Sequence, residues 1–242
     1  MNDLAVITGG GRGIGAAVSR RLAADGYRIL LTYRANAQSA ENLVADLRGN
    51  GVLCAAVKAD FGRREDASLL AGHPWISDGV DVLVLNHGMY ERSPAEEQDL
   101  NALAHTMKVN FHGAVAVWKT LSPNLRSNAR IVVMGSQLGI KGNPTGADYA
   151  ASKGALHAFV RSLAVRVARV GQRVNVVAPG TIETDIVAGD TPQKRAQRKK
   201  EIPMGRLGQP AEVAAVVSFL AGSDSSYITG AVLHVNGGIY LP

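Results

Sequence analysis

Short apolar runs rich in β-branched residues alternate along the chain with segments of helical periodicity. Strands are predicted at 4–8, 28–33, 52–59, 80–85, 130–135, 173–178 and 231–235. Several runs are apolar at nearly every position, which is typical of a parallel sheet covered by helices on both faces. Helices are predicted at 13–25, 38–49, 64–71, 99–126, 149–170 and 210–221. The alternation predicts an α/β fold with a Rossmann-type, doubly wound parallel sheet of about seven strands, whose carboxyl ends face the ligand.

The chain shows no internal repeat and no Pro/Gly/Ser-rich linker long enough to separate domains. We therefore expect residues 1–242 to form one domain. Segment 181–209 follows the sixth predicted strand and places a basic helical stretch between Gly, Asp and Pro residues. This segment should overhang the ligand crevice, either as a mobile lid or as an ordered surface excursion.

Composition limits the cellular compartment and the classes of binding partner that we expect. Apolar runs of about 18 residues are lacking, and the start MNDLAVITGG does not resemble a secretory signal, so we expect a cytoplasmic protein without membrane contact. The net charge of +6 favours anionic partners. Only QKRAQRKK (193–200) is densely basic, and neither zinc-ligand pairs nor an aromatic RNA platform is present, so nucleic acid is not expected. A phosphorylated cofactor and an acidic carrier protein explain the charge as well.

Cysteine and metal chemistry are not expected. The single Cys54 lies in the apolar run VLCAAV, which predicts a buried, inert thiol. The six histidines are scattered without the spacing of metal ligands.

A glycine-rich stretch, TGGGRGIG (8–15), follows the first predicted strand and opens the first predicted helix. Glycines permit a tight turn and close approach of the backbone, and the N–H groups at a helix start attract phosphate. Strand, glycine loop and helix in this order predict a dinucleotide-binding site. The spacing Gly9, Gly13, Gly15 differs from the usual G-x-G-x-x-G.

The stretch ADYAASKGAL (147–156) places Tyr149 and Lys153 one helical turn apart, on one face of the helix. A phenol has an ordinary pKa of about 10, which suits proton transfer poorly at neutral pH. A nearby ammonium stabilises phenolate, so Lys153 is expected to lower the pKa of Tyr149. The small residues around the pair would let a cofactor and a substrate approach closely. On the residues alone, a surface Tyr/Lys pair remains the alternative.

The chain resembles the short-chain dehydrogenase/reductase family, because T-G-x-x-x-G-x-G is followed by Y-x-x-x-K. The resemblance extends over essentially the whole chain, with LNHG (85–88), MKVNFHG around Asn110, GSQLG around Ser136, PGTIET (179–184) and VNGG (235–238) in family order. The strings VVAPGTIETD, GRLGQPAEVA and YITGAVLHVNGG are most similar to 3-oxoacyl-acyl-carrier-protein reductases.

The resemblance implies a catalytic set. Tyr149 would donate the proton, Lys153 would tune it and hold the nicotinamide ribose, Ser136 would bond the substrate carbonyl, and Asn110 would support a water leading from Lys153. It also implies the residues that bind the cofactor, namely Gly9, Gly11, Arg12, Gly13, Ile14, Gly15, Arg34, Asp60, Phe61, Asn86, Gly88, Tyr149, Lys153, Pro179, Gly180, Ile182 and Thr184. Thr184 could bond the nicotinamide amide or merely cap a lid helix; we favour the amide.

The end of the second predicted strand, TYRAN, indicates NADP(H) rather than NAD. NAD sites place a carboxylate there for the ribose 2′-hydroxyl, whereas NADP sites need positive charge for the 2′-phosphate. Arg34 occupies this place, and Arg12 in the glycine loop could reach the same phosphate. A guanidinium suits phosphate because it offers several fixed donors. Two solvated loop arginines are the alternative.

These observations predict NADPH-dependent reduction of a 3-oxoacyl thioester, carried on acyl carrier protein. Arg126, Arg166, Arg169, Arg173 and the 194–200 cluster are candidate docking charges for an acidic carrier. Another carbonyl or alcohol, such as a polyketide intermediate, a sugar or a steroid-like compound, is the first alternative, and a regulator that binds cofactor without turnover is the second. The resemblance implies a homotetramer, formed through helices 99–126 and 149–170 and the C-terminal tail.

One position departs from the family pattern. The usual Asn-Asn-Ala-Gly after the fourth strand is Leu85, Asn86, His87, Gly88 here. We expect His87 to pack at the loop, and a hydrogen bond from its ring to ribose or substrate is the less favoured alternative.

Overall fold

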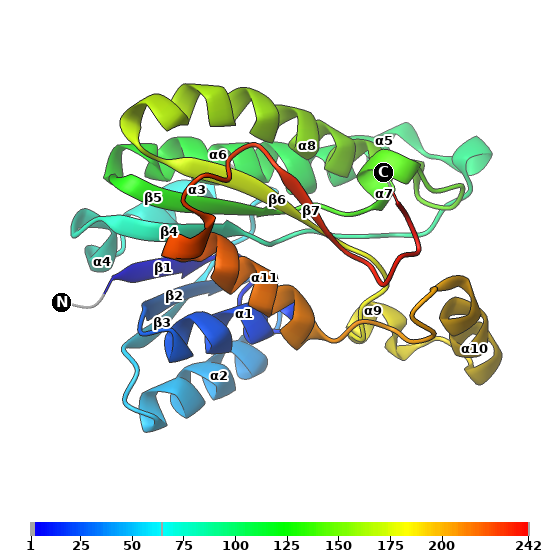
Figure 1. The fold of residues 1–242 in the computed structure, drawn as a ribbon, viewed down its shortest axis with the longest axis horizontal. Coiled ribbons are helices and arrows are strands. Elements are labelled where there is room, and N and C mark those ends of the chain that lie inside the picture. The colour runs from blue at the N-terminus through cyan, green and yellow to red at the C-terminus, as the bar shows by residue number, and fades with distance from the viewer. Residues whose placement is uncertain (1–2, 64, 242) are drawn as a thin grey trace.

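The structure is a computed structural model that describes residues 3–63 and 65–241. Its seven strands form one parallel sheet in the order β3-β2-β1-β4-β5-β6-β7 (Figure 1). The strands are β1 (Leu4–Ile7), β2 (Arg28–Tyr33), β3 (Cys54–Lys58), β4 (Val80–Leu85), β5 (Leu125–Met134), β6 (Arg173–Pro179) and β7 (Val232–Val235). The predicted doubly wound α/β fold is confirmed.

Helices cover both faces of the sheet (Figure 1). One face carries α1 (Gly13–Ala24), α2 (Ala37–Gly49) and α11 (Pro210–Ala221), and the other carries α3 (Glu65–Ala71), α5 (Leu100–Met107), α6 (Gly113–Leu121) and α8 (Ala147–Val167). The core is accordingly split in two. Val18, Leu22 and Val217 pack beneath the first layer, whereas Leu121 and Val160 pack beneath the second. Both faces of the strands are therefore apolar, which is why alternation was absent from their sequences.

The strand order reverses between β1 and β4, so the chain leaves these two strands in opposite directions. A crevice opens at such a point beyond the carboxyl ends of the strands. The loops after β1 and β4 enter this crevice, and the short helices α7 (Leu138–Lys141), α9 (Asp185–Ala188) and α10 (Pro192–Glu201) lie at the same end of the molecule (Figure 1). The remaining short helix, α4 (Pro74–Ser77), lies toward the opposite end.

The prediction of one continuous helix over 99–126 is wrong in two respects, its C-terminal end and its continuity. A π-helical turn, η2 (Lys108–His112), separates α5 from α6, and the helix ends at Leu121. Pro123 lacks an N–H and cannot continue the α-helical hydrogen bonds, so the chain passes through a short 3-10 turn, Ser122–Asn124. β5 then begins at Leu125, five residues earlier than predicted, because Leu125 pairs with Val80 across a register shift.

Segment 181–209 lies between β6 and α11. It contains α9 and α10, and Ile182 forms an isolated bridge with Gly208 that closes its base. Val187, Ile202 and Leu207 form a small apolar cluster inside it. Among the described residues, no helix is long and apolar enough to cross a membrane.

Candidate active site

The glycine loop turns tightly between β1 and α1. Gly9 and Gly13 have φ values of +63° and +52°, which favour glycine. A Cβ on Gly15 would lie 2.1 Å from the Gly9 carbonyl oxygen, so this position also requires glycine. No side chain of the described residues caps the first turn of α1, and its N–H groups are left for a ligand. An anionic group such as a pyrophosphate fits this helix start.

Asn86 holds the loop in place. Its Nδ2 donates to the carbonyl oxygens of Thr8 (3.1 Å) and Gly9 (3.0 Å), and its backbone N–H donates to Thr8 Oγ1 (2.9 Å). Gly9 N–H in turn donates to Thr32 Oγ1 at 3.0 Å. The ends of β1, β2 and β4 are therefore joined behind the glycines. The resemblance gave Asn86 a cofactor contact, and the structure gives it this further role.

The pocket beside the loop has a volume of about 990 Å³. All the residues that the sequence assigned to the cofactor line it, including Gly11, Ile14, Gly88, Pro179 and Gly180. Ile182 is buried at its wall, and Thr184 precedes α9 without accepting a capping hydrogen bond from the described part of the chain. The capping alternative for Thr184 is therefore not supported.

Arg34 lies exposed at the end of the pocket beyond β2, where a 2′-phosphate was expected. Arg12 also lines the pocket, but its guanidinium contacts the Asp185 carboxylate at 3.3 Å, and both side chains are mostly exposed. Such an exposed pair is weak, so Arg12 can exchange this partner for a phosphate. Asp60 follows β3, where its Oδ1 accepts a hydrogen bond from Gly62 N–H (3.0 Å).

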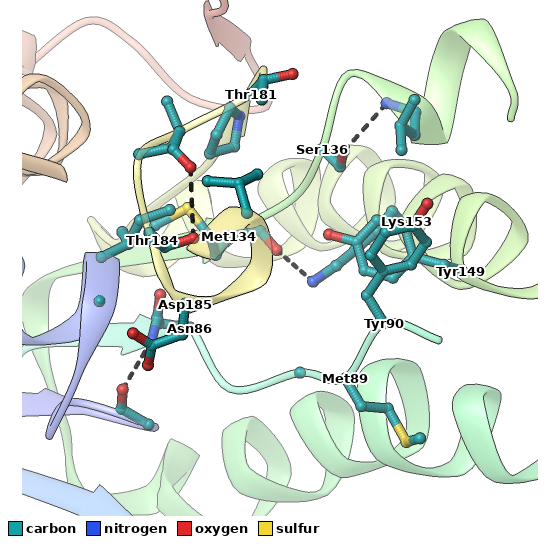
Figure 2. A pocket seen from close by; sticks show the side chains of 18 of the residues that line it. Asn86, Met89, Tyr90, Met134, Ser136, Tyr149, Lys153, Thr181, Thr184 and Asp185 are labelled. Atoms are coloured by element: carbon teal, nitrogen blue, oxygen red, sulfur yellow. Dashed lines mark hydrogen bonds between the residues drawn. The ribbon is translucent and has the colours of Figure 1, made fainter. Parts of the chain in front are cut away.

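Tyr149 and Lys153 lie on one face of α8 and line the same pocket (Figure 2). Lys153 is buried, and its Nζ donates to the Met134 carbonyl oxygen at 2.8 Å. The same ammonium lies 5.6 Å from the centroid of the Tyr149 ring. Lys153 is thus buried and Tyr149 half-buried in the pocket wall at the carboxyl end of β5, a placement that does not favour the surface-pair alternative.

The pKa values of the pair differ from the expectation. Burial raises the pKa of Tyr149 to about 12, and the Ser136 hydroxyl acts in the opposite direction. The prediction that Lys153 brings this pKa below its ordinary value is wrong for the protein alone, because Lys153 points to a carbonyl and desolvation of the phenolate dominates. Burial also lowers the pKa of Lys153 to about 8.

Ser136 follows β5 and is buried against the pocket. Its Oγ accepts a hydrogen bond from Leu138 N–H (3.1 Å), and its own N–H donates to His157 Nε2 (3.4 Å). Burial is the largest cause that lowers the pKa of His157 to about 4, so the ring is neutral and can accept at neutral pH. His157 lies one turn beyond Lys153 on α8, a spacing that could have flagged it in the sequence.

Asn110 is fully buried in the π-helical turn and lies behind the pocket wall. Its Nδ2 donates to Met89 O and to Ser152 Oγ, both at 3.0 Å, and its Oδ1 accepts from Met89 N–H at 2.8 Å. Ser152 Oγ then donates to the Tyr149 carbonyl oxygen at 2.7 Å. The Asn110 side chain thus connects the loop after β4 to α8, the helix that carries Tyr149, and sequence spacing does not reveal this connection.

His87 packs at the loop, as expected. Its ring lies 4.6 Å from the Phe61 ring, and its Nδ1 is 2.8 Å from Thr8 Oγ1. Desolvation is the largest cause that lowers the pKa of His87 to about 3, so this imidazole is neutral.

Four of the proposed docking arginines lie at the wrong end of the molecule. Arg126 and Arg173 begin β5 and β6, and Arg166 and Arg169 follow about 25 Å of α8 from Tyr149. Arg173 is further committed to Ser225 and the Gly222 carbonyl oxygen. Only the 194–200 cluster reaches the pocket, through Lys194, Gln197 and Arg198.

Known proteins are similar to this chain in sequence and in fold. A family model described as enoyl-(acyl carrier protein) reductase matches residues 9–240. The 3-oxoacyl-[acyl-carrier-protein] reductase FabG of Vibrio cholerae is 35% identical, over 98% of this chain and 97% of that protein. The 3beta-hydroxysteroid dehydrogenase 1 of Eggerthella lenta is 34% identical, over 98% and 93%.

A crystal structure of a blue fluorescent protein from a metagenomic library, in complex with NADPH, is similar with a TM-score of 0.93 and 34% identity, over 99% of this chain and 98% of that chain. The similarity in sequence and in fold thus extends over nearly the full length of the chain. The chain belongs to the short-chain dehydrogenase/reductase family of oxidoreductases.

Proposed function

We propose that the protein reduces the β-carbonyl of a 3-oxoacyl thioester with NADPH. The observation that carries this proposal is the convergence of the buried Lys153 and the half-buried Tyr149 on the pocket that begins at the glycine loop. A cofactor-binding regulator needs the glycine loop but has no use for an enclosed phenol and ammonium. The similarity to the V. cholerae FabG supports the thioester as substrate class.

NADPH fits the residues present. The uncapped start of α1 suits the pyrophosphate, and the exposed Arg34 suits the 2′-phosphate. Gly88 lets the loop after β4 approach Asn110 closely, because a Cβ there would lie 3.2 Å from Asn110 Oδ1. When bound, NADPH supplies the hydride that the carbonyl carbon accepts.

Tyr149 supplies the proton. With its pKa raised to about 12, the phenol stays protonated at neutral pH and is ready to donate to the carbonyl oxygen as negative charge develops there. The phenolate that remains needs a cation, and Lys153 is the nearest ammonium, 5.6 Å from the ring centroid. Ser136 orients the carbonyl oxygen, since its hydroxyl lines the same pocket.

Self-association is part of the proposal. Leu100 on α5 and Val165 on α8 are 77% and 70% exposed, although both helices belong to the same layer. Leu100 lies at the start of α5 and Val165 near the end of α8, so the two do not form one patch, and the expectation of a tetramer rests on the family resemblance. Analytical ultracentrifugation should therefore detect a tetramer, and a monomer at micromolar concentration would remove this part of the proposal.

A substrate panel tests the function. NADPH oxidation is followed with acetoacetyl-coenzyme A, with carrier-linked 3-oxoacyl chains and with free ketones, sugars and ketosteroids, and each assay is repeated with NADH. We expect thioesters and NADPH to give the highest kcat/KM. A preference for a free carbonyl would favour another reductase, and binding of NADPH without turnover of any carbonyl would favour the regulator.

A further inference from the structure

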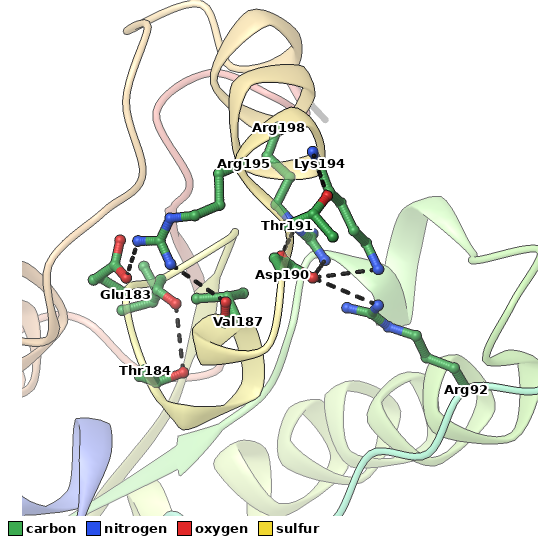
Figure 3. Close-up of polar contacts among 10 residues, drawn as sticks. Arg92, Glu183, Thr184, Val187, Asp190, Thr191, Lys194, Arg195 and Arg198 are labelled. Atoms are coloured by element: carbon green, nitrogen blue, oxygen red, sulfur yellow. Dashed lines mark hydrogen bonds and ion pairs between the residues drawn. The ribbon is translucent and has the colours of Figure 1, made fainter.

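Three basic side chains surround one carboxylate at the end of the pocket away from the glycine loop (Figure 3). Asp190 accepts from Arg198 Nε at 2.5 Å, and Lys194 Nζ and Arg92 Nη1 lie 3.2 and 3.8 Å from it. The Asp190 side chain is 4% exposed. The Arg198 hydrogen bond is the first cause that lowers its pKa, so it is a carboxylate at neutral pH.

The three cations come from two separate parts of the chain. Arg92 lies on the loop after β4, whereas Lys194 and Arg198 are one turn apart on the pocket side of α10. Arg195 turns away and pairs with Glu183 (Figure 3). Lys199 is exposed on α10 and does not line the pocket. Of the basic residues of α10, Lys194 and Arg198 therefore face the pocket.

Positive charge is in excess at this end. Of the described pocket-lining residues on α7, on α10 and on the loop after β4, Arg92, Lys141, Lys194 and Arg198 are basic and Glu201 is acidic, while the Asp190 carboxylate lies buried against three of these cations. Glu201 also accepts a hydrogen bond from Gln197 at 2.9 Å. Basic groups gathered in a cleft create a potential that attracts an anion. Asp190 compensates only part of this charge.

This charged end adjoins the reacting centre. The Tyr90 ring packs on the Tyr149 ring, with centroids 4.7 Å apart. The Arg92 guanidinium lies over the Tyr90 ring, 5.9 Å from its centroid. A substrate with its carbonyl at Tyr149 would therefore extend past Tyr90 to Arg92.

We propose that this end of the pocket binds an anionic group of the substrate, a carboxylate or a phosphate, remote from the carbonyl that is reduced. The proposal rests on the reductase function above. Arg92 is the main specificity-determining residue, because it has the longest contact with Asp190 and is the most readily released to a ligand. Lys194 and Arg198 add charge from α10, and Asp190 keeps the cations in place. The anion is either a phosphate of the group that carries the thioester, such as coenzyme A, or the carboxylate of a free keto acid.

Matched substrate pairs test the proposal and separate the two sources. Acetoacetyl-coenzyme A is compared with the acetoacetyl thioester of N-acetylcysteamine, which lacks phosphate, and 5-oxohexanoate is compared with its methyl ester. The wild type, Arg92→Gln, Arg198→Gln and the control Lys199→Gln are assayed with each. Dissociation constants for NADPH verify that the variants remain folded and bind cofactor.

In Arg92→Gln we expect kcat/KM for the charged member of one pair to fall on the order of tenfold, through KM, with the neutral member unchanged. The affected pair identifies the source. Raised salt should increase KM for that charged substrate in the wild type, and less steeply in Arg92→Gln, where Lys194 and Arg198 remain. The control should behave as the wild type.

The negative outcomes are distinct. If the variants reduce charged and neutral members equally well, or lose activity on both to the same extent, the cations only join α10 to the loop after β4, and the anion site is overturned while the reductase stands. If the wild type binds NADPH but reduces no member of either pair, the reductase function fails and the anion site fails with it.

Discussion

The Tyr90 ring packs against the Tyr149 ring, with centroids 4.7 Å apart and planes tilted by 51°. Tyr90 belongs to the loop after β4, and its hydroxyl accepts a hydrogen bond from Asn143 Nδ2 at 2.9 Å, on the loop that precedes α8. The proposed proton donor is therefore supported on one side by an aromatic ring that is itself fixed from a third segment.

Removal of this support should slow reduction. We expect Tyr90→Ala to lower kcat/KM about tenfold, because an aromatic pair contributes about 1 kcal/mol beyond burial and Tyr149 would sample other rotamers. Tyr90→Phe keeps the ring and should retain most of the activity. Steady-state kinetics with a neutral thioester measures both, and an unaffected Tyr90→Ala would show that Tyr149 needs no such support.

Asn110 should matter for stability as well as for activity. Asn110→Ala leaves the half-buried Met89 N–H and carbonyl groups without their partner, so we expect the free energy of unfolding to fall by about 2 kcal/mol. Ser152→Ala loses the contact with Asn110 but spares Met89, and about 1 kcal/mol is expected. Urea denaturation measures both changes. Equal losses in the two variants would mean that the Met89 contacts contribute little.

Acid should destabilise the fold through the buried His157 and the half-buried His87, whose pKa values are both lowered by desolvation. The folded pKa values of His87 and His157 are about 3 and about 4, below the ordinary 6.5. As pH falls below 6.5, the unfolded chain binds protons that the fold does not, so stability decreases by up to about 1.4 kcal/mol per pH unit for each ring. The loss continues until the pH reaches the folded pKa.

A variant series checks this pH dependence. His87→Ala and His157→Leu should each make stability less steep between pH 6.5 and 4, whereas the control His105→Ala, at an exposed position, should not. Chemical unfolding at several pH values gives the slopes. A slope unchanged in both His87→Ala and His157→Leu would contradict the assignment.

Lys153 should set the alkaline limit of reduction. Its pKa is lowered to about 8, so the ammonium that stabilises the phenolate is lost as pH rises through that value, and kcat/KM should decline above it. Lys153→Arg keeps a cation at all accessible pH values and should move the decline to higher pH, whatever its absolute rate. If the two profiles fall at the same pH, another group causes the decline.

The sheet, the layers and the glycine loop could be predicted from the sequence because their signals are local. Apolar runs, the glycines at 9, 13 and 15, and the spacing of Tyr149 and Lys153 each lie within a few residues of one another. The departure at 121–126 has a local cause too, because Ser122 and Pro123 end the helix between two apolar stretches.

Contacts between distant segments could not be predicted in this way. Asn110 meets Met89 and Ser152, and Asp190 meets Arg92, only after the sheet has formed. The raised pKa of Tyr149 has the same origin: the sequence reveals the neighbouring Lys153, whereas desolvation depends on all the atoms that close over the ring.

The central claim, that the Tyr149 hydroxyl is the proton donor, is tested most directly by Tyr149→Phe. NADPH-bound protein is mixed with a 3-oxoacyl thioester in a single turnover, and loss of NADPH absorbance is followed. We predict unchanged NADPH affinity and a rate lowered by at least about a hundredfold, the contribution typical of a general acid. A rate equal to that of the wild type would contradict the account.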